Sequence, residues 1–206
     1  MEPLSGWKNV GFRIGAVIPA AGLSSRMGAL KPLLPCAEST VIESAVSAAL
    51  LYADVVAVVL GYRAGEIQTV LSNRFDNRVK TVLNPDFRES DMLRSVQIGV
   101  GVLRDCDGFF LLPGDMPAVK PVVFERLIGA FDGEKEVIYP TYGGRKGHPP
   151  LVHASLIAGI LRYHGGGGLK AVLKDCSVAT VETEDIGILK DLDTPEDYAE
   201  MIHGGL

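Results

Sequence analysis

The stretch of the chain best suited to chemistry is PAAGLSSRMGALKPLL at residues 19–34, where small residues precede two cations, Arg26 and Lys31. Backbone N–H groups in such a loop can point at phosphate oxygens, and the cations can neutralise the remaining charge. The spacing is not that of a P-loop, because five residues rather than four separate Gly22 from Gly28, and the G-x-G-x-x-G dinucleotide fingerprint is also missing. The stretch therefore predicts a phosphate-binding loop of another type. The alternative is a flexible loop with two surface cations.

A carboxylate follows an apolar run further along the chain. Residues 108–112 (GFFLL) lead into Pro-Gly-Asp-Met-Pro, which places Asp115 just after a predicted strand. In open α/β sheets ligands gather at the carboxyl ends of strands, so Asp115 is expected in the same crevice as the small-residue loop. Mg²⁺ takes one or two carboxylates and fills its other positions with phosphate oxygens and water. Asp115 is therefore a candidate Mg²⁺ ligand, and the alternative is an aspartate that caps a turn.

A second carboxylate is offered by the segment DLDTPED at residues 191–197. Asp191 and Asp193 would point to the same side if this segment is extended. Thr194 is a good helix N-cap and Pro195 suits the first helical position, so a final helix is expected to begin here. Either aspartate could complete the metal site, or both could serve only helix capping; we prefer Asp193.

The hydrophobic pattern supplies the scaffold for these residues. Buried strands are predicted from short apolar runs at residues 14–20, 54–60, 79–83, 108–112 and 137–141, and helices from 3.6-residue spacing at 40–51, 64–71, 93–103 and 122–131. This alternation predicts an α/β fold: a doubly wound, mostly parallel, Rossmann-like sheet with helices on both faces. Further on we expect helices near 155–163 and 169–173 and short strands near 178–181 and 186–189. No repeat or linker interrupts the pattern, so residues 1–206 are expected to form a single domain.

Composition excludes several classes of function. Hydrophobic residues make up 47% and charged residues 22%, an ordinary globular balance. The net charge of −5 argues against a nucleic-acid binder. The three cysteines lack metal-ligand spacing, and no apolar stretch approaches the ~18 residues of a membrane helix. We therefore expect a cytoplasmic protein with neither nucleic acid nor membrane as partner.

The pattern Ala20-Ala21-Gly22-x-Ser24-x-Arg26-Met27-Gly28-x-x-Lys31 resembles the signature of the MobA-like NTP transferases, within the nucleotide-diphospho-sugar transferase fold. The resemblance extends over nearly the whole chain. It implies a loop that wraps the NTP phosphates, with Arg26 and Lys31 on the charge that moves to departing pyrophosphate and Asp115 on Mg²⁺. The nucleotide-binding residues that it implies are Ala20, Ala21, Gly22, Leu23, Ser24, Ser25, Arg26, Lys31, Asn84, Ser95, Gly114 and Asp115.

The same resemblance extends to the acceptor side, with departures. Gly147-His148-Pro149 is similar to a family motif near the acceptor, and His148 could hydrogen-bond an acceptor phosphate. The segment from Asn84 to Ser95 resembles the part that contacts base and ribose, but its Glu-Ser-Asp-Met-Leu-Arg-Ser stretch keeps only Ser95 and a shifted Met92 of the usual pattern. The glycine run at residues 165–168 replaces the usual Gly-Asp-x-Gly.

By resemblance we expect transfer of a nucleoside monophosphate from an NTP to molybdopterin or its molybdenum-bearing form, with a molybdoenzyme as possible client. Ala-Ala-Gly in place of Ala-Gly-Gly at residues 20–22 is similar to the cytidylyltransferases and favours CTP. Two alternatives stay open: the same chemistry with GTP or a sugar or polyol phosphate, and a non-catalytic chaperone that carries the molybdenum cofactor.

Overall fold

The central sheet of the protein is built around strand β1 (Ile14–Ala20), whose side chains are nearly all buried. The structure is a computed structural model that describes residues 11–23 and 27–204. The strand order is β10-β7-β9-β6-β1-β4-β5, with β8 added at β7. The other strands are β4 (Val55–Leu60), β5 (Val79–Leu83), β6 (Gly108–Leu111), β7 (Val137–Tyr142), β8 (Arg145–Lys146), β9 (Leu151–His153) and β10 (Val178–Glu182).

The sheet is mostly parallel, as the sequence predicted. β1 pairs in parallel with β4 and β6, β4 with β5, and β10 with β7, whereas β9 runs antiparallel between β6 and β7. Strands buried on both faces read as continuous apolar runs, which is why β1 and β4 could be recognised in the sequence.

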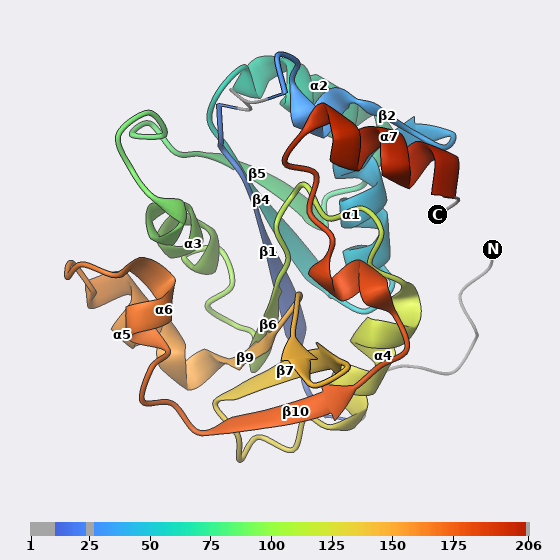
Figure 1. Cartoon of the computed structure of the whole chain (residues 1–206). Helices are drawn as coiled ribbons and strands as arrows, with labels where there is room; N and C mark the ends of the chain where they lie inside the picture. The colour runs from blue at the N-terminus through green and yellow to red at the C-terminus, as the bar shows by residue number, and fades with distance from the viewer. Residues whose placement is uncertain (1–10, 24–26, 205–206) are drawn as a thin grey trace.

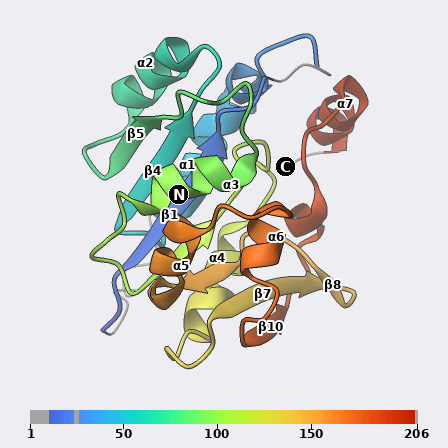
Figure 2. The ribbon, with the colours of Figure 1, turned by 90° about the vertical axis from the view of Figure 1, so that its left-hand side faces the viewer.

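Helices cover both faces, so the sheet is doubly wound (Figures 1 and 2). Neighbouring residues of a strand point to opposite faces, and Ile18 belongs to one core layer while Val17 belongs to the other. The layer of Ile18 contains buried residues of α1 (Val41–Leu50), α2 (Ala64–Arg74) and α4 (Pro121–Gly129). The layer of Val17 contains residues of α3 (Met92–Val100), α5 (Ile157–Arg162) and α6 (Gly168–Val172).

The strand order places a topological switch point at β1. The chain passes from β1 outward to β4 and β5, and then crosses to β6 on the other side of β1. The connections after β1 and β6 therefore diverge from neighbouring strand ends and leave a crevice there, the usual place for a ligand in such folds. Both candidate motifs, the loop after Ala20 and Asp115, lie at this edge.

One predicted strand is wrong. Residues 186–189 form the 3₁₀ helix η3 (Ile186–Leu189), because the carboxylate of Asp185 caps it by accepting from the backbone N–H of Gly187 at 3.0 Å. The same carboxylate accepts from the N–H of Lys120 at 2.8 Å, and a Cβ on Gly187 would lie 2.3 Å from the carbonyl oxygen of Ala118. Contacts with a distant loop thus override the local apolar pattern.

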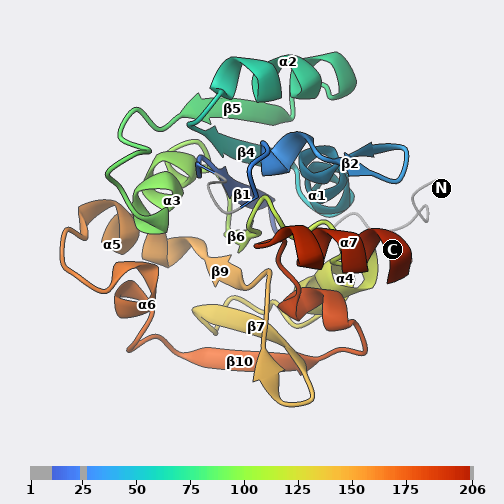
Figure 3. The same cartoon turned by 45° about the horizontal axis from the view of Figure 1, so that its top comes forward.

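The final helix, α7 (Pro195–Gly204), begins where its capping residues predicted. The hydroxyl of Thr194 accepts from the N–H of Asp197 at 3.2 Å, and the carboxylate of Asp197 accepts from the N–H of Thr194 at 2.8 Å. α7 lies beside the small hairpin of β2 (Pro35–Cys36) and β3 (Ser39–Thr40), as Figure 3 shows. Among the described residues, none of the helices is long and apolar enough to cross a bilayer.

Candidate active site

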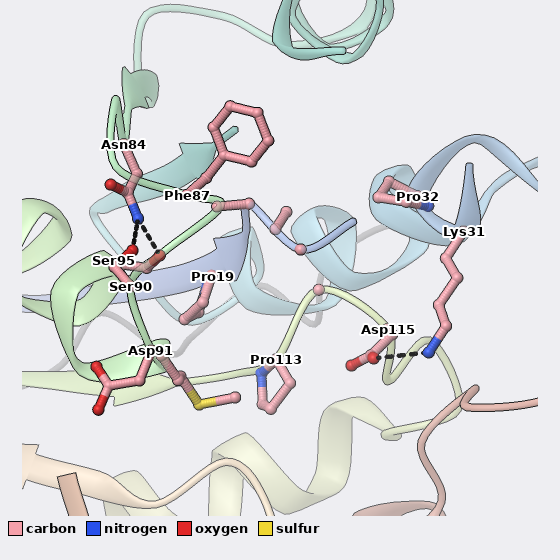
Figure 4. Close-up of a pocket in the computed structure, with 15 residues that line it drawn as sticks. Pro19, Lys31, Pro32, Asn84, Phe87, Ser90, Asp91, Ser95, Pro113 and Asp115 are labelled. Carbon is pink, nitrogen blue, oxygen red and sulfur yellow. Dashed lines mark hydrogen bonds and ion pairs between the residues drawn. The ribbon is translucent and has the colours of Figure 1, made fainter. Parts of the chain in front are cut away.

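A cleft of about 240 Å³ opens at the switch point (Figure 4). Its walls come from the ends of β1 and β6 and from the loop between β5 and α3. The lining residues are Pro19, Ala20, Ala21, Gly22, Lys31, Pro32, Asn84, Phe87, Ser90, Asp91, Met92, Ser95, Pro113, Gly114 and Asp115. Most of the predicted nucleotide-binding residues are therefore in one place. Leu23 is 39% exposed and is not among the lining residues. Ser24, Ser25 and Arg26 lie outside the described residues.

The loop that leaves β1 is held tightly from behind and is open in front. The N–H of Gly114 donates to the carbonyl of Pro19 at 3.0 Å, and the N–H of Tyr62 donates to the carbonyl of Ala21 at 3.3 Å. A Cβ on Gly61 would lie 2.6 Å from that same Ala21 oxygen, so glycine is needed there for the close approach. Gly22, by contrast, faces open space. Backbone in this arrangement is available to a ligand on the cleft side.

Lys31 lies between two carboxylates at the end of the cleft. Its Nζ is 2.9 Å from Oδ1 of Asp193 and 3.6 Å from Oδ2 of Asp115, and its side chain is only 11% exposed. Burial raises the pKa of Asp115; Lys31 opposes that rise, whereas Asp191 and Asp193 add to it. Lys31, Asp115 and Asp193 come from distant parts of the chain and form what we call the charged cluster.

Asn84 organises the opposite wall. It is 1% exposed, and its Nδ2 donates to the hydroxyls of Ser90 and Ser95, each at 3.1 Å, while its Oδ1 accepts from the N–H of Asp86 at 3.0 Å. The resemblance led us to Asn84 and Ser95, but Ser90 and the neighbouring Phe87 were missed. The signal that could have pointed to Ser90 was its place between Asn84 and Ser95, in the segment expected to contact base and ribose.

We expect Asn84→Ala to raise the KM for the NTP about tenfold or more with little change in kcat. The substitution removes three hydrogen bonds that shape the loop, each worth about 0.5–1.5 kcal/mol, but no group of the charged cluster. Steady-state kinetics with varied NTP tests this. Asn77→Ala, at an exposed asparagine before β5, is the control and should leave KM unchanged. Equal KM values for the two variants would show that Asn84 does not shape the nucleotide wall.

A second cavity of about 380 Å³ adjoins the first and shares Met92, Pro113 and Asp115 with it. Its other lining residues are Met116, Lys146, Gly147, His148, Ile188, Leu189, Asp191 and Asp193. Asp115 thus stands where the two cavities meet. His148 was predicted to contact the acceptor and does lie in this second cavity. Lys146, an exposed residue of the two-residue strand β8, was missed because a single exposed lysine carries no sequence signal.

His148 is held in place by its surroundings. Its backbone N–H donates to the carbonyl of Ile188 at 2.8 Å, and Nδ1 of its ring lies 3.4 Å from the carbonyl oxygen of Leu111. Burial lowers the pKa of His148, and the carbonyl contact and the nearby carboxylates only partly offset that effect, which favours the neutral ring. A Cβ on Gly147 would lie 2.4 Å from the Ile188 oxygen, which explains the glycine before the histidine.

The charged cluster suits a divalent cation that brings its own further ligands. Among the described residues, no group of three histidine, cysteine, aspartate or glutamate side chains is gathered as a ready metal site. Two carboxylates, however, already share one cation, the Lys31 ammonium. Mg²⁺ needs few protein ligands when phosphate oxygens and water complete its shell, so Asp115 and Asp193 fit that chemistry.

Taken together, the doubly wound sheet, the small-residue loop at its switch point and the lysine–carboxylate cluster define an α/β nucleotidyltransferase. The chain belongs to the family of MobA-like NTP transferase domains, which matches residues 16–182. It is 31% identical over 186 residues to the molybdenum cofactor cytidylyltransferase of Escherichia coli (strain K12), with 90% of this chain and 93% of that protein covered.

Solved structures agree on the fold. A nucleotidyl transferase from Methanothermobacter is 29% identical, with a TM-score of 0.79 and with 91% of this chain and 95% of that chain covered. Rv0371c from Mycobacterium tuberculosis in complex with manganese has a TM-score of 0.75 at 22% identity, with 94% of this chain and 100% of that chain covered. The predicted fold class, family and enzyme class are thus confirmed.

Proposed function

We propose that this enzyme transfers CMP from CTP to a phosphorylated acceptor, molybdopterin or its molybdenum-bearing form, and releases pyrophosphate. The observation that carries the proposal is the position of the charged cluster: Asp115 lines both the cleft and the adjoining cavity. A transferase for two phosphorylated substrates needs its charge-neutralising groups at that junction. The Escherichia coli relative is a molybdenum cofactor cytidylyltransferase, which supports the choice of cytidine and molybdenum cofactor.

The proposed reaction is an in-line displacement. An oxygen of the acceptor phosphate attacks the α-phosphorus of CTP and forms a new P–O–P bond. The bond from the α-phosphorus to the bridging oxygen breaks, and its electron pair leaves with pyrophosphate. No general base is required, because an acceptor phosphate is already largely ionised near pH 7. Such transfers depend on positioning and on neutralising charge.

Each residue of the site has one part in this scheme. Ala20, Ala21 and Gly22 bring backbone close to the triphosphate, with Leu23, Ser24 and Ser25 continuing that loop. Lys31, with Arg26, neutralises the charge that moves to pyrophosphate. Asp115 and Asp193 would hold Mg²⁺, which would supply positive charge to offset that of the phosphate groups. The nucleotide-binding wall of the cleft is formed by Asn84, Ser95 and Gly114, and His148 binds the acceptor.

The experiment that tests this function is incubation of the protein with CTP, Mg²⁺ and molybdopterin. We expect pyrophosphate release that requires all three components. Binding of molybdopterin without pyrophosphate release would instead favour a carrier of the cofactor, and release with a sugar or polyol phosphate alone would change the acceptor.

Selectivity for CTP over GTP is expected to depend on Ala21. This residue lines the cleft and is 6% exposed, and we expect its methyl group to leave less room for a purine base than for a pyrimidine. Discrimination by one methyl group is worth about 1–3 kcal/mol, or roughly tenfold to a couple of hundredfold. Titration calorimetry with each NTP and Mg²⁺ should show CTP binding more tightly, and Ala21→Gly should improve GTP binding. Equal affinities in the unaltered protein would contradict the argument.

A further inference from the structure

The C-terminal segment of the chain supplies one residue of the charged cluster and contacts the other two. This segment, residues 191–204, which we call the C-terminal strap, lies beyond the range that the family matches. The N–H of Leu192 donates to the carbonyl of Asp115 at 3.0 Å, and the next residue, Asp193, pairs with Lys31. The strap thus contacts Asp115 and Lys31 and itself supplies Asp193.

The strap also holds the segment that carries Lys31. The hydroxyl of Tyr198 donates to the carbonyl of Pro35 at 2.8 Å. Between Lys31 and Pro35 the chain makes one short turn, closed by the N–H of Leu34 donating to the Lys31 carbonyl at 3.1 Å. Leu192 packs with Cys36 in a small apolar cluster separate from the two core layers, and the side chain of Tyr198 packs against this cluster. The position of the Lys31 backbone is therefore tied to α7.

The other partner of the ion pair is fixed by the residue that precedes Tyr198. The carboxylate of Asp197 accepts from the N–H of Asp193 at 3.1 Å and from the N–H and hydroxyl of Thr194, each at 2.8 Å. Both ends of the Lys31–Asp193 pair are thus set by successive residues of the first turn of α7. A lysine loses much rotamer freedom when its ammonium is held in one place, so anchoring its backbone lowers the cost of each productive arrangement.

We propose that Tyr198 is a positioning residue for transfer: its hydrogen bond to Pro35 holds Lys31 where its ammonium reaches Asp193 and Asp115. This rests on the proposed function, because Lys31 must act on transferring phosphate for its register to affect turnover. The strap is then a working part of the site.

Tyr198→Phe tests the proposal, since it removes only the hydroxyl and keeps the ring in the apolar cluster. We expect kcat to fall about five- to tenfold at saturating CTP and acceptor, with KM for the acceptor unchanged. Amide hydrogen exchange in residues 31–41 should speed up by a similar factor. Glu200→Gln is the matched control: it removes the charge of another α7 side chain, the carboxylate that pairs with Lys190 at 2.8 Å, and should change neither quantity.

The two readouts separate the possible failures. Unchanged kcat in Tyr198→Phe, with or without faster exchange, overturns the positioning role. An equal loss in Glu200→Gln overturns it too, because the effect would then come from general loosening of α7. If no acceptor supports turnover in the unaltered protein, the proposed function fails; the strap is then judged by exchange in residues 31–41, and unchanged exchange in Tyr198→Phe overturns its anchoring role.

Discussion

Asp115→Ala is expected to lower transfer about a thousandfold or more while leaving the protein folded. The carboxylate lines both cavities and lies 3.6 Å from the Lys31 ammonium, so its loss should remove the proposed metal ligand and disturb the cation beside it. Removing one well-placed electrostatic group from a transition state costs a few kcal/mol, and loss of the metal adds to that.

The fold should tolerate this change for identifiable reasons. The contact of Asp115 with the C-terminal strap runs through its backbone carbonyl, which alanine retains. Its carboxylate also lies near Asp191 and Asp193, so removing it relieves repulsion. Thermal unfolding checks the fold and pyrophosphate release checks turnover. Asp191→Ala, at an exposed carboxylate, is the matched control and should lose much less activity than Asp193→Ala. Normal turnover in a folded Asp115→Ala protein would contradict the assignment of Asp115 as a metal ligand.

Lys31→Ala is expected to reduce kcat about a hundredfold or more. The Lys31 side chain is only 11% exposed, and among the described residues it is the cationic side chain that lines the cleft. Loss of a cation aimed at transition-state charge typically costs a few kcal/mol. The pKa of Asp115 should also rise further, because Lys31 now opposes its increase by burial.

Two comparisons make the Lys31 result specific. Lys190→Ala removes an ion-paired lysine of similar geometry, 2.8 Å from Glu200, outside the cleft, and should leave kcat within about twofold. Ser25→Ala should also have a smaller effect, because a hydroxyl neutralises no charge. Similar small losses in Lys31→Ala and Ser25→Ala would place the Lys31 side chain outside the reaction.

The scaffold could be predicted from the sequence because its signals are local. A strand buried on both faces, such as β4, is an unbroken apolar run, and Thr194 with Pro195 marks the start of α7 by its own chemistry. The convergence of Asp115 with the loop after β1 followed from topology, since neighbouring parallel strands end at the same edge.

What the sequence could not reveal depends on contacts between distant residues. Tyr198 bonds to Pro35, 163 positions away, and nothing near either residue announces the pair. The short strands β8 and β9 carry too few residues for a readable period, so no strand was predicted on either side of Gly147. The 3₁₀ helix at Ile186–Leu189 owes its shape to Ala118 and Lys120, not to its own apolar pattern.

The most direct test of the account follows the α-phosphorus of CTP. The unaltered protein should be given CTP labelled at the α-phosphate, Mg²⁺ and molybdopterin, and the products separated. We predict that the label appears covalently on the acceptor in equal amounts with released pyrophosphate, and that both vanish with Asp115→Ala. Label that stays in CTP while molybdopterin is bound, or label released as free CMP with no acceptor product, would contradict nucleotidyl transfer to this acceptor.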